Sequence, residues 1–226
     1  MRQHPGIEFY YAKRARCYEQ VYSTVPSKGL MNRFYRIAWF PLRRIYNYTM
    51  QYLAGRSQQR ILDVGCGTGI YSIELAKRGN RVTALDACKE MIDATATLVK
   101  RERLAERLET VCGDYLKWSR DTTTNYDLVL AIGVMDSVQD ALTHLESFRR
   151  MAGEIILTFP ARSPLSPITE FSYRRHGIVG YSYTKEQVRG LLDDAGFKIV
   201  HFDKIFPGNY WVHARRDHQK ASHPHA

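Results

Sequence analysis

Glycine occupies every second position over residues 65–69, directly after an apolar run that holds one acid, Asp63. The run 61–64 is typical of a buried parallel strand. Residues 70–79 have apolar side chains at helical spacing and end in glycine, which predicts a helix with its stop signal. Glycines between a strand and a helix let the backbone pass close to a ligand without an intervening side chain. The pattern therefore predicts a turn that holds a nucleotide.

Two common nucleotide motifs do not fit this turn. The dinucleotide fingerprint needs a glycine where this chain has Ile70, and the phosphate-binding P-loop needs a Gly-Lys-Ser/Thr ending that is absent. Asp63 would repel a pyrophosphate, but a carboxylate there suits a ligand with a cationic amine. S-adenosylmethionine (SAM) is such a ligand.

Asp63, Gly65, Gly67 and Gly69 match in full the pattern D/E-x-G-x-G-x-G. The segment resembles motif I of the class I SAM-dependent methyltransferases, and the resemblance extends over roughly residues 58–216. In its general layout the chain is similar to the group that includes quinone and magnesium-porphyrin methyltransferases. The resemblance implies SAM as the methyl donor and S-adenosylhomocysteine (SAH) as the product.

The same resemblance implies a set of cofactor-binding residues. Asp86, at the end of a second expected strand, would accept both ribose hydroxyls. Asp114 is placed where the family contacts the adenine amine, with Tyr115 beside it as an apolar wall. The full expected set is Tyr11, Tyr18, Asp63, Gly65, Cys66, Gly67, Gly69, Asp86, Ala87, Met91, Asp114, Tyr115, Ile132 and Gly133.

Alternating strand and helix patterns predict the scaffold that positions these residues. Strands are expected at 61–64, 81–86, 108–114, 126–134, 153–160, 197–202 and 209–214, and helices at 70–79, 88–101, 140–151 and 184–195. This order predicts an α/β fold: a Rossmann-like, doubly wound, seven-stranded and mostly parallel sheet with an N-terminal helical lid.

Composition agrees with one enzyme domain. The length of 226 residues and an apolar content of 44% suffice for one core. We expect a lid over 1–57, a SAM-binding domain over 58–216 with a substrate-side insertion at 161–183, and a flexible tail at 217–226. We recognise no signal peptide, no apolar run long enough to span a membrane and no metal-ligand spacing. The four cysteines lack C-x-x-C spacing. We therefore expect free thiols and a cytoplasmic protein, with a peripheral membrane contact left open.

The net charge of +10 is concentrated before the glycine turn. Residues 1–60 carry eleven Lys or Arg against two Glu, and they hold twelve of the 27 aromatic residues. By analogy with the family, this part forms helices that cover the methyl donor, broken near 26–29 and at Pro41.

Three interpretations of this basic, aromatic lid stay open. In the first, its aromatic rings pack on the sheet while Lys and Arg face water. In the second, it serves an acidic or lipophilic acceptor at a membrane surface, with 30–53 in the interface. In the third, it binds nucleic acid. The alternatives to a small-molecule enzyme are accordingly an RNA methyltransferase and a non-catalytic SAM-binding partner subunit. The sequence does not reveal the oligomeric state.

The chemistry is expected beyond the carboxyl end of the fourth strand. Asp136 is the ionisable side chain there, either as the group that deprotonates an acceptor or as the N-cap of the next helix. His176 is the second candidate base, with a solvated loop histidine as its alternative. Residues expected to contact the substrate are Tyr10, Arg14, Met135, Arg174 and Tyr183. In-line displacement onto a small molecule, with oxygen as the accepting atom, is the predicted reaction.

Overall fold

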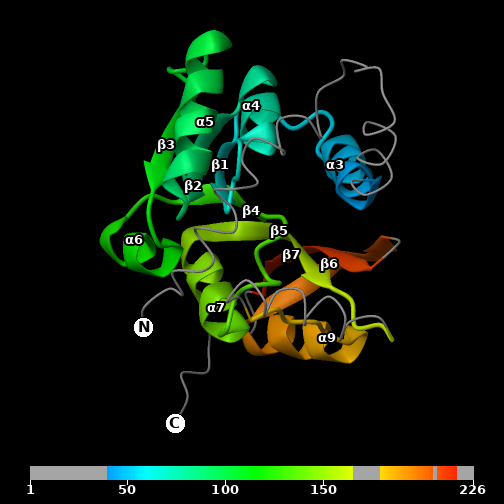
Figure 1. The fold of residues 1–226 in the computed structure, drawn as a ribbon. Helices are drawn as coiled ribbons and strands as arrows, with labels where there is room; N and C mark the ends of the chain where they lie inside the picture. Colours follow the sequence, from blue (N-terminus) through cyan, green and yellow to red (C-terminus); the bar gives the residue numbers. More distant parts are fainter. Residues whose placement is uncertain (1–39, 165–178, 206–207, 218–226) are drawn as a thin grey trace.

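The computed structural model describes residues 40–164, 179–205 and 208–217. In this part of the chain, seven strands form one sheet in the order β3-β2-β1-β4-β5-β7-β6 (Figure 1). The strands are β1 (Arg60–Val64), β2 (Arg81–Asp86), β3 (Leu108–Cys112), β4 (Tyr126–Ala131), β5 (Ala152–Pro160), β6 (Phe197–Ile205) and β7 (Asn209–Arg216). All neighbours run parallel except β7, which is antiparallel to both β5 and β6. The predicted Rossmann-like, mostly parallel sheet is confirmed.

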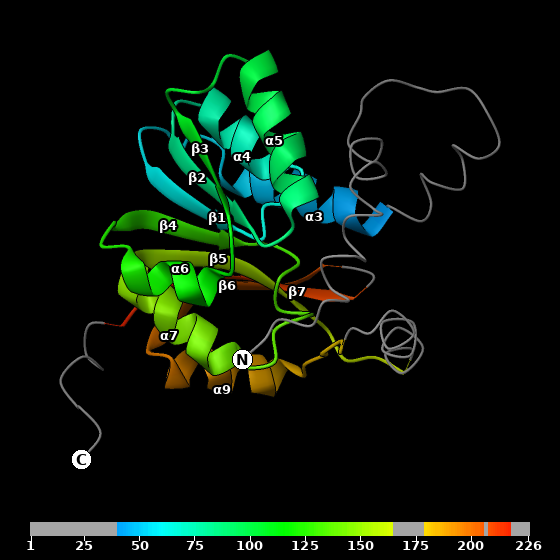
Figure 2. The ribbon, with the colours of Figure 1, turned by 60° about the vertical axis from the view of Figure 1, so that its left-hand side comes forward.

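Helices cover both faces of the sheet, as Figure 2 shows. The described helices are α3 (Phe40–Tyr52), α4 (Ile70–Lys77), α5 (Lys89–Arg101), α6 (Tyr115–Asp121), α7 (Ala141–Met151) and α9 (Lys185–Asp194). α3, α4 and α5 lie on one face, and α6, α7 and α9 lie on the other. Each face has its own apolar core: Ile61 of β1 belongs to the first, and its neighbour Leu62 belongs to the second. A strand buried on both sides explains the unbroken apolar run in the sequence.

Strand β1 occupies the point at which the strand order reverses. It pairs with β2 on one side and with β4 on the other. β2 follows helix α4, which lies on one face of the sheet, and β4 follows helix α6, which lies on the other face. In open α/β sheets, ligands bind at such a reversal, beyond the carboxyl ends of the strands. The loops that follow Val64, Asp86 and Ala131 therefore form the edge where a ligand belongs.

Two predicted strands are shorter in the structure than in the sequence pattern. The third ends at Cys112 because Asp114 accepts a hydrogen bond from the Lys117 backbone N–H and caps α6, a helix that the sequence pattern did not predict. The fourth ends at Ala131, since Gly133 has a φ of +74° that an extended strand does not allow.

The described part of the expected lid is helix α3 together with residues 53–57. Pro41 is the second residue of the described helix. The chain before Phe40 lies outside the described residues, so the expected break near Pro41 stays a prediction.

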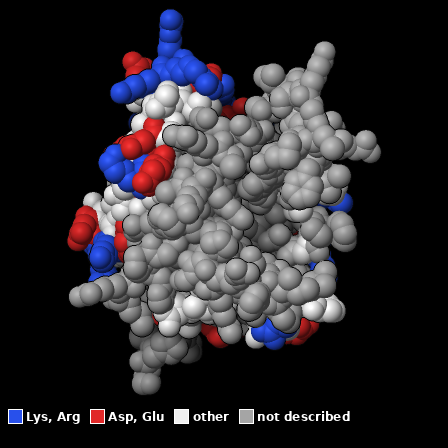
Figure 3. All heavy atoms as spheres, viewed as in Figure 1, with Lys and Arg blue, Asp and Glu red and all other residues white. Residues whose placement is uncertain are grey.

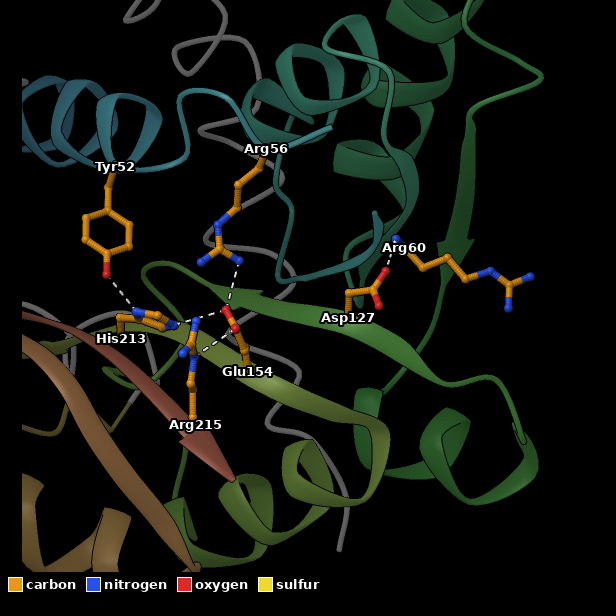
Figure 4. A network of polar contacts seen from close by, with 7 residues as sticks. All are labelled: Tyr52, Arg56, Arg60, Asp127, Glu154, His213 and Arg215. Atoms are coloured by element: carbon orange, nitrogen blue, oxygen red, sulfur yellow. Dashed lines mark hydrogen bonds and ion pairs between the residues drawn. The ribbon is translucent and has the colours of Figure 1, made fainter. Parts of the chain in front are cut away.

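Side chains of α3 bind the far strands of the sheet. The Tyr52 hydroxyl lies 2.7 Å from Nδ1 of His213, and Thr49 accepts a hydrogen bond of 2.9 Å from the Trp211 indole. Figure 4 shows that the His213 ring also meets Glu154, which binds the guanidinium groups of Arg56 and Arg215. These contacts join segments about 160 positions apart and hold α3 on the sheet.

The apolar face of α3 is buried inside the protein. Ile45, Met50 and Leu53 are nearly inaccessible and belong to the core that α3 shares with β1 and β7. Phe40 of the same helix is 52% exposed, and the membrane contact expected of 30–53 stays a prediction. No helix of the described residues is both long and apolar enough to cross a bilayer.

On the face drawn in Figure 3, the visible described surface carries both signs of charge, with Lys and Arg gathered at the carboxyl end of α5. Lys100 and Arg101 close this helix, where positive charge interacts favourably with the helix dipole. This end lies at the edge opposite the loops that follow Val64, Asp86 and Ala131.

Candidate active site

The glycine turn adopts a backbone that requires glycine at three positions. The φ angles of Gly65, Gly67 and Gly69 are +66°, +56° and +76°. A Cβ atom on Gly65 would lie 2.6 Å from Val134 Cγ2, and one on Gly69 would lie 2.5 Å from Thr95 Cγ2. At Gly67 a Cβ atom would meet nothing within 4 Å. The turn is thus packed at its two ends and open at its middle glycine.

Both polar backbone groups of Gly67 are held from other elements. Its N–H donates to Oδ2 of Asp86 at 2.9 Å, and its carbonyl accepts from the Thr95 hydroxyl at 3.0 Å. The second oxygen of Asp86 accepts from the Cys88 N–H, so this carboxylate joins the turn to the start of α5. Burial raises the pKa of Asp86, and the hydrogen bonds from Cys88 and Gly67 oppose that shift.

Asp63 lies beneath the turn rather than on its surface. Its side chain is 2% exposed and accepts a hydrogen bond from the Ser72 hydroxyl of α4. Burial raises the pKa of the Asp63 carboxyl to about 7; the bond from Ser72 opposes this shift, and the charge of Asp86 adds to it. A cationic group bound above the turn would favour the charged form of both carboxylates.

The loop after β4 is fixed by three hydrogen bonds. The Gly133 N–H donates to the Thr158 hydroxyl at 2.9 Å, and the Tyr181 N–H donates to the carbonyl of Asp136 at 2.8 Å. The Tyr183 hydroxyl donates to the carbonyl of Met135 at 3.2 Å. Residues 179–183, at the end of the expected insertion, therefore hold the loop where chemistry is expected.

Asp136 is half-buried in this loop. The alternative interpretation of Asp136 as a helix N-cap is wrong, because Asp140 caps α7 by accepting from the Thr143 N–H at 3.0 Å. The role of the Asp136 carboxylate as a base stays a prediction.

Met135 and Tyr183, expected to contact substrate, are core residues in the structure. Met135 is fully buried, and the Tyr183 ring packs edge-on against Phe159. Burial raises the pKa of Tyr183 to about 12, and the charge of Asp136 adds to that shift. Their expected contact with the substrate stays a prediction.

Tyr115 is also a core residue, and its expected place as an apolar wall beside the adenine stays a prediction. Its ring packs on Phe148 of α7, and its hydroxyl donates to Ser147 at 2.9 Å. Burial raises the pKa of Tyr115 to about 12. Asp114 begins α6 at the carboxyl end of β3, and it uses one side-chain oxygen as the helix cap.

The remaining expected residues fall into two groups. Cys66, Ala87, Met91 and Ile132 lie in or beside the described turn, α5 and the loop after β4. Outside the described residues are Tyr10, Tyr11, Arg14, Tyr18, Arg174 and His176, together with the expected tail after residue 217.

Three hydroxyl residues that hold the site were missed from the sequence. Ser72, Thr95 and Thr158 are at most 1% exposed, and each binds a residue of the expected cofactor set. The only available signal was a hydroxyl at a position that the helix or strand pattern assigns to the core. Within the described ranges, no group of three His, Cys, Asp or Glu residues could hold a metal ion.

The geometry fits SAM. Open space above Gly67 allows a ligand to approach the backbone, and four carboxylates, Asp63, Asp86, Asp114 and Asp136, gather at the carboxyl ends of β1 to β4. Negative charge at this edge complements a cationic ligand and opposes a pyrophosphate.

Comparisons with known proteins agree with the site. A family model described as a methyltransferase domain matches residues 61–153. The ubiquinone/menaquinone biosynthesis C-methyltransferase UbiE of Cereibacter sphaeroides is 26% identical over 192 residues, which are 73% of this chain and 76% of that protein. The ubiquinone biosynthesis O-methyltransferase of Aliivibrio fischeri is 31% identical over 111 residues, or 49% of this chain and 46% of that protein.

A solved structure shares the fold across nearly the whole chain. The magnesium protoporphyrin IX methyltransferase of Synechocystis PCC 6803 with bound SAH superposes with a TM-score of 0.72 at 18% identity, covering 93% of this chain and 98% of that one. The matched motif, the site built around it and the shared fold lead to one conclusion. The protein is a SAM-dependent methyltransferase, and it is similar to the class I quinone and magnesium-porphyrin methyltransferases.

Proposed function

We propose that the protein transfers the methyl group of SAM to an oxygen atom of a small-molecule acceptor at the carboxyl end of β4. The observation that carries the choice of oxygen is the Asp136 carboxylate in the loop held by Tyr181 and Tyr183. A hydroxyl must lose its proton to become a strong nucleophile, and a positioned carboxylate accepts that proton. One relative is named as a ubiquinone biosynthesis O-methyltransferase and another as a ubiquinone/menaquinone biosynthesis C-methyltransferase, and both names support a quinone precursor as the acceptor.

The cofactor would be held by residues on three strand ends. In the proposal, the Gly67 backbone lies against the ligand, Asp86 accepts the ribose hydroxyls, and the Asp63 charge favours the cationic amine. Asp114 contributes its carboxylate at the adenine end. Bound SAM supplies an electrophilic methyl group on a sulfonium.

Protein groups then have two tasks in the reaction. The loop 133–136, fixed by Thr158, Tyr181 and Tyr183, orients the acceptor oxygen along the line of transfer. Asp136 takes the hydroxyl proton. His176 remains the second candidate base, and the contacts of Tyr10, Arg14 and Arg174 with the acceptor remain part of the proposal.

Calorimetry tests the cofactor part of the proposal. Wild-type protein should bind SAM and SAH, and Asp86→Ala should weaken both. Asp93→Ala is the matched control, because Asp93 is an exposed aspartate of α5 that pairs with Lys89. Equal affinities of wild type and Asp86→Ala would contradict the assigned role of Asp86, and no binding by wild type would contradict the site.

A labelled-methyl screen tests the acceptor. The panel holds hydroxylated quinone precursors, porphyrin carboxylic acids, small amines and a mixed RNA sample. Label in an ether of a phenolic compound supports oxygen transfer, whereas label on carbon, on nitrogen or in RNA overturns it. With the acceptor identified, Asp136→Asn should lower kcat by about 100-fold or more while the Kd for SAM stays within about threefold.

A further inference from the structure

We propose that Thr95 of α5 is a positioning residue that holds the glycine turn in its SAM-binding conformation. The inference rests on the proposed position of the cofactor against Gly67. Thr95 is fully buried, and its hydroxyl lies 3.0 Å from the carbonyl oxygens of both Gly67 and Met91. One hydroxyl hydrogen is thus shared between its own helix and the turn.

The bond to Gly67 is the part that matters for the ligand. A threonine in a helix commonly donates to the carbonyl four residues earlier, and Thr97 does so to Asp93 at 2.8 Å. Thr97 is exposed and bonds only within its helix. Thr95 makes the same helical bond and also reaches across 28 positions to the turn. A comparison of variants at the two threonines therefore distinguishes the loss of a hydrogen bond within the helix from the loss of the bond to the glycine turn.

The methyl group of Thr95 adds a second constraint. A Cβ atom on Gly69 would lie 2.5 Å from Thr95 Cγ2 and 2.9 Å from its Oγ1, so the side chain fits closely over that glycine. Gly69 has a φ of +76° and directly precedes α4. Thr95 thus restrains Gly67 through its hydroxyl and Gly69 through its packing.

Thr95 and Asp86 hold opposite groups of the same residue. Asp86 accepts from the Gly67 N–H, and Thr95 donates to the Gly67 carbonyl. When Asp86 accepts the ribose hydroxyls, its oxygen is shared with a second donor, and the bond from Thr95 keeps the turn in place. The effects of the two residues on SAM affinity should therefore be coupled.

The experiment compares Thr95→Val, Thr95→Ser and the control Thr97→Val by calorimetry with SAM. Valine keeps the shape and removes the hydroxyl, so the Kd should rise about tenfold. Serine keeps the hydroxyl and should stay within about threefold of wild type, and Thr97→Val should match wild type. A double-mutant cycle combines Thr95→Val with Asp86→Asn. The double variant should change the Kd for SAM by a factor that differs clearly from the product of the factors measured for the two single variants.

A ligand-free measurement separates this inference from the proposed function. In backbone amide spectra without SAM, Thr95→Val should shift the Gly67 and Gly69 resonances and speed their hydrogen exchange, and Thr95→Ser should restore both. Unchanged turn resonances in Thr95→Val, or a Kd for Thr95→Ser as weak as that of Thr95→Val, would overturn the role of the hydroxyl. Turn resonances that respond as expected in a protein that does not bind SAM would overturn the proposed function alone.

Discussion

The Cα of Gly65 faces the side chain of Val134 so closely that a Cβ atom on this glycine would lie 2.6 Å from Val134 Cγ2. This contact joins the turn after β1 to the loop after β4, the two segments that meet where the strand order reverses. Because Gly65 also has a φ of +66°, no other residue fits here without moving one of the two loops.

Gly65→Ala should therefore weaken SAM binding more than tenfold and lower the free energy of unfolding by about 1–3 kcal/mol. Calorimetry and urea denaturation measure the two effects. Gly153→Ala is the control, since a Cβ on that strand glycine meets nothing within 4 Å. Wild-type affinity in Gly65→Ala would show that the two loops separate freely.

Asp63 should make stability fall as the pH rises towards neutrality. Burial raises its folded pKa to about 7, against about 3.9 for an unfolded aspartate, so the folded protein binds the proton more tightly. The contribution is complete below about pH 4 and is lost as the pH rises through about 7.

Wild type minus Asp63→Asn gives the contribution of the carboxyl, measured by urea denaturation from pH 5 to 8 without ligand. We expect this difference to fall by up to about 1.4 kcal/mol per pH unit below pH 7. A difference that grows as the pH rises would mean that Asp63 has a lowered pKa and is held as a carboxylate.

Thr49 should contribute to the docking of α3. Its hydroxyl is the partner of the buried Trp211 indole N–H, so Thr49→Val leaves that donor without its acceptor. We expect a loss of about 1–3 kcal/mol in the free energy of unfolding, measured with urea. Gln51→Ala, an exposed change on the same helix, should stay within about 0.5 kcal/mol of wild type. Equal stability of Thr49→Val and wild type would contradict the expectation.

Tyr183 should affect turnover more than cofactor binding. Tyr183→Phe removes the donor to the Met135 carbonyl and keeps the ring on Phe159. With an identified acceptor, kcat should fall several-fold while the Kd for SAM is unchanged, because the loop orients the acceptor. The opposite pattern, weaker SAM binding at full kcat, would place the loop on the cofactor side.

Local patterns were sufficient for the strands that are buried on both faces. β2 has the predicted bounds, 81–86, because its residues 82–85 are buried, with Val82 and Ala84 in one core and Leu85 in the other. They failed at α6, which has only seven residues and whose start depends on one capping bond that Asp114 accepts from the Lys117 backbone N–H. Tyr115 is the first residue of this helix, and its ring belongs to the apolar core.

The sequence by itself determined the class of ligand. The spacing of Asp63, Gly65, Gly67 and Gly69 restricts the backbone and the charge of one short turn, and both are local properties. Only the tertiary structure decided what holds that turn. Thr95 and Val134 reach it from α5 and from the loop after β4, and packing between elements distant in the sequence leaves no periodic signal along the chain.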